Sequence, residues 1–294
     1  MLISSWNVNS VRARIDNIKS YLVKYKPDIL LMQEIKTEEV NFPFDVFSSL
    51  DYESHVHGQK SYNGVAIISK KKLDNVKTDI IKDKLKQSRI ISAEVEHKKK
   101  KIQLINIYTP NGNPVDTPKY EYKKNWLDDL IKKLKSLSKT NKNIILAGDF
   151  NVIPAAEDVY NPKSFEDDAL YRLEIRKKFR EMLGLGFSDV YRHFNETKEG
   201  YTFWDYMRGA WQKNNGMRID HFLVSSSVID NIKKININKD PRGREKPSDH
   251  TPIEITLAYF NFNCRLLTLL YYNTKMLYYN NQLKRRKNES RVCI

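Results

Sequence analysis

Residues 143–151 read Asn-Ile-Ile-Leu-Ala-Gly-Asp-Phe-Asn, an apolar run that ends in two polar side chains. The apolar run is typical of a buried strand. In an extended chain, Asp149 and Asn151 would share one face and Phe150 would point to the other, because side chains alternate along a strand. A turn is the alternative, since Asp-x-Asn after Gly148 commonly forms one. The stretch predicts a β-rich core with polar groups at a strand end.

Three other polar clusters lie beside similar apolar runs. Asn7 and Asn9 follow residues 2–6, Gln33 and Glu34 follow residues 28–32, and Ser248, Asp249 and His250 precede residues 252–257. A β-rich core brings strand ends to one rim, where loops carry chemistry on a rigid support. We therefore expect the four clusters to meet and to form a divalent-metal phosphodiesterase site.

Each cluster also has a local interpretation. A carboxylate such as Glu34 at a buried strand end is costly unless paired, so it is either a magnesium ligand or a salt-bridged edge residue. His250 belongs either to a local turn or to a pair with a distant carboxylate, for which Asp220 is a candidate. Such a pair stabilises charge on a phosphoryl oxygen or transfers a proton. The coincidence of several such groups at strand ends favours catalysis.

The hydrophobic pattern predicts strands that alternate with helices. Strands are expected at residues 29–32, 64–69, 90–95, 102–108, 144–147, 219–224 and 253–257, and helices at 11–25, 118–137 and 169–183. The lysine-rich turn at residues 98–101 predicts a hairpin between two of the strands. Hairpins favour a mixed or antiparallel sandwich flanked by helices over a doubly wound parallel sheet.

Composition divides the chain into two parts. Residues 1–258 contain no linker-like segment and are expected to form one domain. Residues 259–294 contain Tyr-Tyr and Asn-Asn pairs, and their seven basic residues and one acidic residue carry +6 of the net charge of +15. We expect this basic, aromatic tail to be poorly ordered. The alternative is a further contact with nucleic acid or membrane.

The charge and the cysteines restrict the classes of function. An excess of 51 basic over 36 acidic residues favours a polyanionic partner, although it does not separate DNA, RNA and anionic membrane. A surplus that serves only solubility is the alternative. Both cysteines lie in the tail, so the main domain has no disulfide framework and no cysteine-based zinc site. Without a signal peptide or a long apolar segment, a cytoplasmic protein that does not bind membranes is expected.

Six motifs, in order and in approximate spacing, resemble those of exonuclease III type apurinic/apyrimidinic (AP) endonucleases. They are Trp6-Asn7-Val8-Asn9, Leu31-Met32-Gln33-Glu34, Tyr108-x-x-Asn111-Gly112, Gly148-Asp149-Phe150-Asn151, Met217-Arg218-Ile219-Asp220 and Lys246-Pro247-Ser248-Asp249-His250. Residues 57–60 and 202–207 strengthen the resemblance, which runs from Met1 to about Ala258. The family pattern has no counterpart of the tail.

The resemblance implies a four-layer α/β sandwich, in which two mixed β-sheets pack face to face between helices, with Mg²⁺ or Mn²⁺ as cofactor. Glu34 would be the principal metal ligand, with Asn7 and Asp249 nearby. The motifs imply that Asp149 would activate or orient the attacking water and that Asn151 would position that water or the phosphate. Tyr108 would contact the scissile phosphate. His250, paired with Asp220, would bind and polarise a non-bridging oxygen.

The resemblance further implies a DNA-repair nuclease that cleaves 5′ to abasic sites, trims 3′ ends and leaves 3′-hydroxyl and 5′-phosphate ends. Its expected partner is double-stranded DNA with abasic sites or blocked 3′ ends, bound by a monomer. The implied substrate contacts are Asn111, an apolar pocket of Phe203, Met217 and Ile219 for a flipped-out sugar, and a minor-groove wedge of Met207 and Arg208. Met217 stands where some relatives have tryptophan or leucine, which leaves the balance of the two activities open.

Three other functions remain open from the sequence. A phosphatase or phosphodiesterase of the same fold would share the metal and the histidine but has no need of the apolar pocket or the wedge. A non-catalytic nucleic-acid-binding module has no need of buried carboxylates beside a phosphate. A peripheral membrane protein would depend on the tail.

Overall fold

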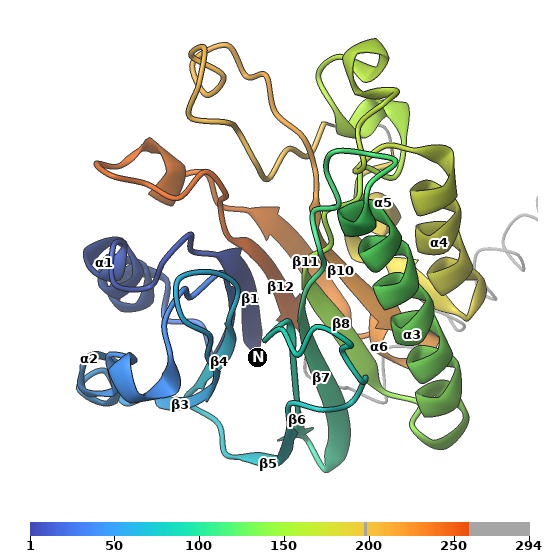
Figure 1. The fold of residues 1–294 in the computed structure, drawn as a ribbon. Helices are drawn as coiled ribbons and strands as arrows, with labels where there is room; N and C mark the ends of the chain where they lie inside the picture. Colours follow the sequence, from blue (N-terminus) through green and yellow to red (C-terminus); the bar gives the residue numbers. More distant parts are fainter. Residues whose placement is uncertain (197–198, 259–294) are drawn as a thin grey trace, which may run out of the picture. The chain divides into compact units, whose positions relative to one another are not determined.

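The structure is a computed structural model that describes residues 1–196 and 199–258 (Figure 1). The expected poor order of residues 259–294 lies outside the described residues. Met1–Ala258 form one compact unit. No helix in the described ranges has the length and hydrophobicity that a membrane span requires.

Two mixed sheets of six strands each form the centre of the described residues. The first has the spatial order β11 (Ile232–Ile237), β12 (Ile253–Leu257), β1 (Leu2–Asn7), β2 (Ile29–Gln33), β4 (Val65–Ser69), β3 (Glu53–His57). The second has the order β5 (Leu73–Lys77), β6 (Ile90–His97), β7 (Lys100–Tyr108), β8 (Ile144–Asp149), β10 (Asp220–Ser225), β9 (Phe187–Asp189).

One parallel pair lies near the middle of each sheet, β1 with β2 and β7 with β8, and the other neighbours are antiparallel. A parallel pair requires a crossover connection, which is helical in both sheets. Helix α1 (Ile15–Tyr25) joins β1 to β2, and α3 (Pro118–Thr140) joins β7 to β8. These crossovers place helices on the outer faces of the sandwich.

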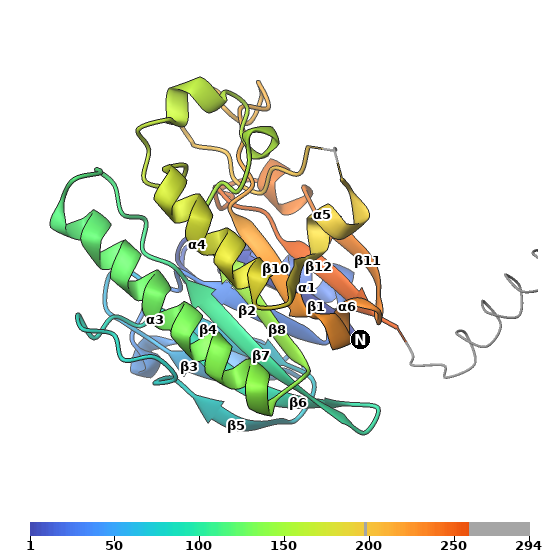
Figure 2. The ribbon, with the colours of Figure 1, turned by 90° about the vertical axis from the view of Figure 1, so that its right-hand side faces the viewer.

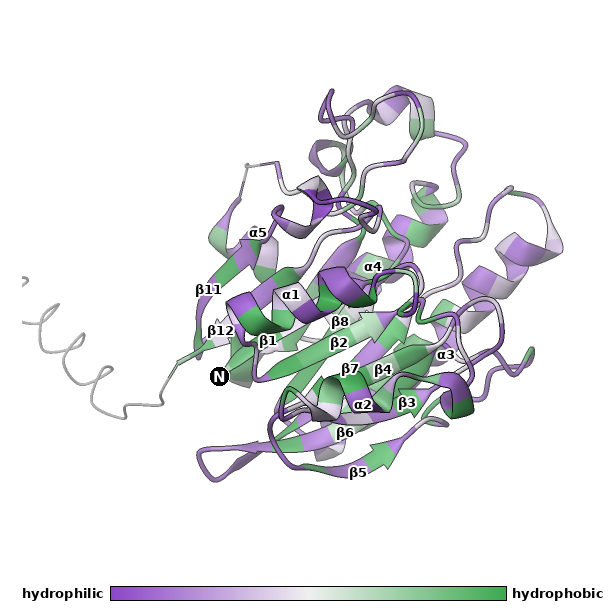
Figure 3. Cartoon of the chain, turned by 90° about the vertical axis from the view of Figure 1, so that its left-hand side faces the viewer, coloured by the Kyte–Doolittle hydropathy of each residue, from purple (hydrophilic) through white to green (hydrophobic). Residues whose placement is uncertain are grey.

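The layers follow the order helix, sheet, sheet, helix, which confirms the predicted four-layer α/β sandwich. Figure 3 shows α1 and α2 (Phe44–Ser48) over the first sheet, and Figure 2 shows α3 and α4 (Leu173–Gly184) over the second. The short helices are α5 (Val190–Phe194), α6 (Ser226–Ile229), and the 3₁₀ turns η1 (Glu39–Asn41), η2 (Ala156–Asp158), η3 (Pro162–Phe165) and η4 (Pro241–Gly243).

Each sheet buries both faces because its side chains alternate between two apolar clusters. Leu31 of β2 and Leu104 of β7 belong to the cluster between the sheets. Their neighbours point outward, Leu30 toward the cluster that includes α1 and Ile105 toward the cluster that includes Trp126 of α3. Strands covered on both sides are continuously apolar, and this is the pattern by which the central strands were predicted.

All seven predicted strands and three predicted helices are present, and the apolar run at residues 2–6 forms β1, but two helices begin later than expected. The helix expected from residue 11 begins at Ile15 after a turn. The helix expected from residue 169 begins at Leu173, because the Asp168 side chain accepts a hydrogen bond from Leu170 N and holds a turn there. The predicted hairpin between β6 and β7 is confirmed.

The strands that the pattern did not predict are β3, β5, β9 and β11, which are the edge strands of the two sheets. Their exposed positions carry mostly polar side chains, as in the β5 sequence Leu-Asp-Asn-Val-Lys, where three of the four exposed residues are polar. Edge strands are commonly polar or short because an apolar edge would pair with other chains. Their hydrophobic signal is therefore weak.

Candidate active site

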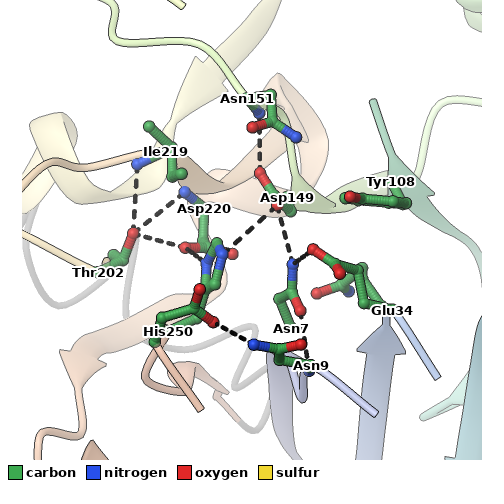
Figure 4. A network of polar contacts seen from close by, with 12 residues as sticks. Asn7, Asn9, Glu34, Tyr108, Asp149, Asn151, Thr202, Ile219, Asp220 and His250 are labelled. Atoms are coloured by element: carbon green, nitrogen blue, oxygen red, sulfur yellow. Dashed lines mark hydrogen bonds and ion pairs between the residues drawn. The ribbon is translucent and has the colours of Figure 1, made fainter. Parts of the chain in front are cut away.

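The site forms at one edge of the sandwich, where β1, β2, β7 and β8 end and β10 begins (Figure 4). Asn7, Tyr108 and Asp149 are the last residues of β1, β7 and β8, and Asp220 is the first residue of β10. The register places Asp149 opposite both Tyr108 and Asp220. Parallel strands end at the same edge, and an antiparallel neighbour begins there, so residues distant in sequence become adjacent.

Residues just after three of the strands, β1, β2 and β8, adopt left-handed backbone conformations. The φ angle is 46° at Asn9, 50° at Glu34 and 47° at Asn151. Asparagine tolerates this region, whereas a glutamate there is uncommon and costs free energy. Hydrogen bonds from Ser10 N to Glu34 O at 2.7 Å and from Ile35 N to Gly64 O at 3.2 Å hold the Glu34 turn. The conformation aims the Glu34 carboxylate into the site.

A cavity of about 690 Å³ lies at this edge. Twelve of the predicted site residues line it: Glu34, Tyr108, Asn111, Asp149, Asn151, Phe203, Met207, Arg208, Met217, Ile219, Asp249 and His250. The other two, Asn7 and Asp220, are buried behind these side chains and hydrogen-bonded to them. Gln33, named in one of the clusters, instead points between the sheets and donates to Asn106 Oδ1 at 2.7 Å.

Glu34, Asp149 and His250 form what we call the acid–imidazole cluster. Each offers one ligand atom, and these atoms lie within 4.8 Å of one another. Asn7 Nδ2 joins the two carboxylates, at 2.8 Å from Glu34 Oε1 and 3.0 Å from Asp149 Oδ2. Of the predicted metal ligands, Asp249 lies on the same cavity, where its Oδ1 accepts from Asn9 Nδ2 at 3.1 Å.

The Glu34 side of the cluster fits a hard divalent cation. Burial favours the neutral form of Glu34, but Lys36, whose Nζ lies 2.8 Å from Glu34 Oε2, and the amide of Asn7 lower the pKa of this carboxyl below its ordinary value. Glu34 is therefore ionised at neutral pH. Carboxylate and amide oxygens are the donors that Mg²⁺ and Mn²⁺ prefer, and the described residues offer no cysteine ligand that would favour zinc.

His250 and Asp220 form the predicted pair. His250 Nδ1 lies 2.8 Å from Asp220 Oδ2, and Thr202 Oγ1 donates to the same oxygen at 2.6 Å. Nε2 lies 3.7 Å from Asp149 Oδ2. Burial alone would lower the pKa of His250, but the Asp220 and Asp149 carboxylates raise it above its ordinary value. The imidazole is therefore cationic at neutral pH and has a fixed orientation.

Asp149 has the opposite character. Burial raises the pKa of the Asp149 carboxyl, and the nearby Asp220 carboxylate raises it further, against the effect of His250. Its Oδ1 accepts from Asn151 N at 2.8 Å, so residues 149–151 form a turn. The extended conformation expected for this stretch is wrong and the turn is right. Both residues nevertheless line the cavity, and the Asn151 amide is held there by donation from its Nδ2 to Thr109 O at 2.9 Å.

Tyr108 presents a neutral phenol to the cavity. Burial and then the charges of Glu34 and Asp149 raise the pKa of Tyr108 well above its ordinary value. The Arg89 guanidinium stacks 4.8 Å from the ring centroid and donates to Tyr108 O at 3.1 Å. Arg89 therefore fixes the position of a ring that can donate a hydrogen bond at any physiological pH.

A buried lysine supports the floor of the site. Lys123 of α3 is fully buried, and its Nζ donates to Asn111 O, Asn151 O and Ala169 O at 2.9, 2.6 and 3.0 Å. Burial lowers the pKa of this ammonium to about 7. Lys123 ties together three loops, and Asn111 Nδ2 also donates to Asn151 Oδ1 at 3.3 Å.

Phe203, Met217 and Ile219 form what we call the apolar wall. They belong to one hydrophobic cluster, and Phe203 and Met217 pair through an isolated β-bridge. The Phe203 ring lies 4.9 Å from the His250 ring in an edge-to-face arrangement. The wall therefore begins directly beside the acid–imidazole cluster.

The predicted wedge lies at the rim of the cavity. Met207 is 68% exposed, and Arg208 has a left-handed φ of 57°. The preceding Tyr206 OH donates to Pro247 O at 2.8 Å and accepts from Asn9 Nδ2 at 3.2 Å. These bonds attach the wedge to the loops that carry Asn9 and Asp249.

Sequence reasoning assigned no role to Lys36, Arg89, Lys123 or Thr202, although Thr202 lies in one of the supporting motifs. Lys36 is two residues from Glu34 and Thr202 precedes Phe203, so proximity to a motif offered a weak signal for both. Lys123 carries no signal, since it lies in a helix with many surface lysines and only the packing shows that it is buried.

The paired sheets and the carboxylate and imidazole groups at their common edge define the class of the protein, a phosphoric ester hydrolase. The model of the endonuclease/exonuclease/phosphatase family matches residues 4–250. The chain belongs to this family.

The chain is similar to curated relatives over most of its length. It is 31% identical to exodeoxyribonuclease III of Haemophilus influenzae, over 86% of this chain and 98% of that protein. It is 35% identical to a DNA-(apurinic or apyrimidinic site) endonuclease of Dictyostelium discoideum, over 87% of this chain and 70% of the relative.

Solved structures have the same fold. A 3′–5′ exonuclease from Neisseria meningitidis superposes with a TM-score of 0.84 at 32% identity, and an AP endonuclease from Archaeoglobus fulgidus with 0.83 at 33%. Each comparison covers 88% of this chain and 100% of the other. A 3′ phosphatase from Neisseria, bound to a product DNA hairpin, matches with a TM-score of 0.82 at 32% identity over 88% and 100% of the two chains.

Proposed function

We propose that this protein is a DNA-repair nuclease. With Mg²⁺ or Mn²⁺ it hydrolyses the phosphodiester bond 5′ to an abasic site and removes nucleotides or blocking groups from 3′ ends of double-stranded DNA. The products carry 3′-hydroxyl and 5′-phosphate ends. The observation that supports this function most is the continuity of the acid–imidazole cluster with the apolar wall in one cavity.

Glu34 is the residue proposed to hold the metal ion, with Asn7 and Asp249 beside it. When bound, a divalent cation supplies positive charge to the phosphate as charge develops in the transition state. Glu34 suits this role because it is ionised and because its turn aims the carboxylate into the cavity. Lys36 holds the free carboxylate in place through its 2.8 Å contact.

His250 is proposed to bind a non-bridging phosphoryl oxygen. Its Nδ1 is engaged by Asp220, so the Nε2 atom is the one available to the substrate. The imidazolium would stabilise the negative charge that accumulates on the phosphoryl group, in a site that is already organised before the reaction. The Tyr108 phenol is proposed to donate a hydrogen bond to the same phosphate.

Asp149 is proposed to orient the attacking water and accept its proton. A carboxylate whose pKa is raised toward neutrality is a stronger base than an ordinary aspartate. Asn151 is proposed to orient the water or the phosphate. Its main-chain oxygen accepts from Lys123 Nζ, and its side-chain Nδ2 donates to Thr109 O.

The apolar wall is proposed to receive the baseless sugar, and Met207 with Arg208 to enter the minor groove. Asn111 is proposed to contact the substrate beside Asn151.

We assign these activities to residues 1–258 as the catalytic domain, acting as a monomer in the cytoplasm. The net charge of +15 supports a DNA partner through its phosphates.

The test is cleavage of a labelled duplex with one abasic site, with and without Mg²⁺, beside an undamaged duplex with a recessed 3′ end. We expect magnesium-dependent incision 5′ to the abasic site and shortening of the recessed strand. Glu34→Ala should abolish both, whereas Glu38→Ala, at a nearby exposed carboxylate, should not. Full activity of Glu34→Ala, or no cleavage of either duplex by the native protein, would refute the proposal.

A further inference from the structure

We propose that the catalytic cavity contains a second subsite, formed by Tyr160 and Phe165, which stacks on the base of a 3′-terminal nucleotide. This inference rests on the proposed nuclease function. None of the roles described above uses either residue, although both line the same cavity as the acid–imidazole cluster.

The two rings form an aromatic surface at the rim. Their centroids lie 5.9 Å apart with an interplanar angle of 84°, an edge-to-face arrangement. Tyr160 is 43% exposed, whereas Phe165 is half-buried and packs against the hydrophobic cluster that contains the apolar wall. Phe165 therefore supports a Tyr160 ring that remains accessible from the cavity.

The backbone attaches this surface to the apolar wall. Val159 pairs with Met217 through an isolated β-bridge, and Tyr160 N donates to Gly216 O at 3.1 Å. The segment around η2 and η3 and the loop before β10 extend beyond the same end of the sheets in both Figure 1 and Figure 2. Tyr160 is thus held in a fixed position relative to Met217 rather than on an independent loop.

Ordinary core packing does not explain Tyr160. A tyrosine that serves the core buries its ring, and Tyr171 and Tyr201 nearby are only 8% and 5% exposed. Base recognition requires an accessible aromatic face, and Tyr160 offers one in the same cavity as the polar acid–imidazole cluster. Every base has a π-face, so stacking on an aromatic ring binds nucleotides without selecting their sequence.

The position of Tyr160 next to the apolar wall indicates which of the two proposed activities would use the subsite. A sugar at the apolar wall would direct its 5′ phosphate toward the acid–imidazole cluster, and a base on that sugar, attached at the opposite side of the ring, would project away from the cluster. An abasic sugar has no group to place against Tyr160, whereas a 3′-terminal nucleotide does. Stacking on Tyr160 would therefore assist 3′-end trimming and contribute nothing to incision at abasic sites.

The experiment compares the two activities within each full-length variant. The substrates are a duplex with one tetrahydrofuran abasic analogue and a recessed duplex whose 3′-terminal nucleotide is mispaired. We expect Tyr160→Ala to lower the ratio of kcat/KM for the terminal nucleotide to kcat/KM for the abasic site by about tenfold. Tyr160→Phe keeps the ring and should restore the native ratio. Phe194→Ala, which removes an exposed ring from α5, is the control.

A ratio is insensitive to partial unfolding, because loss of folded enzyme lowers both rates together. An unchanged ratio in Tyr160→Ala, or a ratio that Tyr160→Phe fails to restore, would overturn the subsite.

A second measurement tests the subsite without catalysis. The probe is the recessed duplex with 2-aminopurine as its 3′-terminal base, in the presence of EDTA. Stacking should quench its fluorescence on the native protein and on Tyr160→Phe but not on Tyr160→Ala. If the native protein binds and quenches this probe but cleaves neither duplex with Mg²⁺, the nuclease function fails while the subsite stands. Equal quenching by native protein and Tyr160→Ala refutes the subsite alone.

Discussion

His250 Nδ1 lies 2.8 Å from Asp220 Oδ2, and both side chains are almost fully buried, at 3% and 2% exposure. A buried cation beside a buried anion is stable only if the two remain paired. Since Asp220 also accepts from the Thr202 hydroxyl, its carboxylate is fixed from two sides. The pair therefore sets both the orientation and the charge of the imidazole that faces the cavity.

Asp220→Asn should lower kcat by roughly 10²-fold or more, because the amide cannot hold His250 in its cationic form. The sign of the pH effect follows from the raised pKa of His250. Without the Asp220 charge this pKa falls, so the variant should lose its remaining activity as pH rises at a lower pH than the native protein does. The measurement is a pH profile of abasic-site incision.

The control for this variant is Asp74→Asn, which removes one negative charge from exposed β5. It should leave the pH profile unchanged. An Asp220→Asn variant with native kcat and a native profile would show that the pair is structural only.

Magnesium should stabilise the folded protein through Glu34. A ligand that binds only the native state adds about 2.7 kcal/mol when its concentration is 100 times Kd. We expect MgCl₂ to raise the Tm of the native protein above that in NaCl of equal ionic strength, and EDTA to reverse the shift. Glu34→Gln should remove the shift and Glu38→Gln should keep it. A shift that persists in Glu34→Gln would place the metal elsewhere.

The sequence was sufficient to predict the strands that lie in the middle of each sheet and the polar groups at their ends. Residues 29–32 and 144–147 are apolar throughout because both faces of these strands are covered, and this is the strongest strand signal. The four polar clusters were identifiable because each follows or precedes such a strand, whereas the substrate contacts came from the resemblance to the family motifs. The edge strands gave little signal, since burial does not constrain their exposed side chains.

The sequence predicted that the four clusters meet, but not the individual hydrogen bonds that join these distant segments. The bond between Asn7 and Asp149 spans 142 residues, and that between Tyr206 and Asn9 spans 197. The left-handed turn at Asn151 also defeated the expectation of alternating side chains, because the Asp149 carboxylate captures the main-chain N–H two residues later. Tertiary packing decides such details, and no periodicity reports them.

Lys123 should be essential for stability. Lys123→Met keeps the buried stem but leaves the carbonyls of Asn111, Asn151 and Ala169 without their shared donor, at a cost of about 3 kcal/mol. Lys135→Met changes an exposed lysine of the same helix and should alter stability by about 0.5 kcal/mol or less. Urea unfolding followed by circular dichroism measures both. Equal stability of the two variants would show that water replaces the ammonium without loss.

His221 should make stability depend on pH. The ring is buried between Arg218, which donates to its Nδ1 at 3.0 Å, and Val152 O, which lies 3.0 Å from Nε2. An arginine can only donate and a carbonyl can only accept, so the native ring is neutral with its proton on Nε2. Burial and the charge of Arg218 lower the pKa of His221 to about 4, from 6.5.

The folded pKa lies below the unfolded one, so between these values the unfolded chain binds more protons and stability falls as pH falls. The contribution of His221 is complete above pH 6.5 and is lost by about pH 4, a difference of about 3 kcal/mol. Burial raises the pKa of Asp149 from 3.8 to about 7, so this carboxyl acts in the opposite direction across the whole window and the native slope alone is not diagnostic.

The difference between native protein and His221→Gln isolates the histidine, because Asp149 contributes equally to both. Glutamine can also accept from Arg218 and donate to Val152 O, but it does not titrate. We expect the free energy of unfolding of the native protein to fall, relative to that of His221→Gln, by about 3 kcal/mol as pH falls from 7 to 4. Parallel curves over this range would mean that the folded protein protonates His221 as readily as the unfolded chain, and that Arg218 moves away from the ring at low pH.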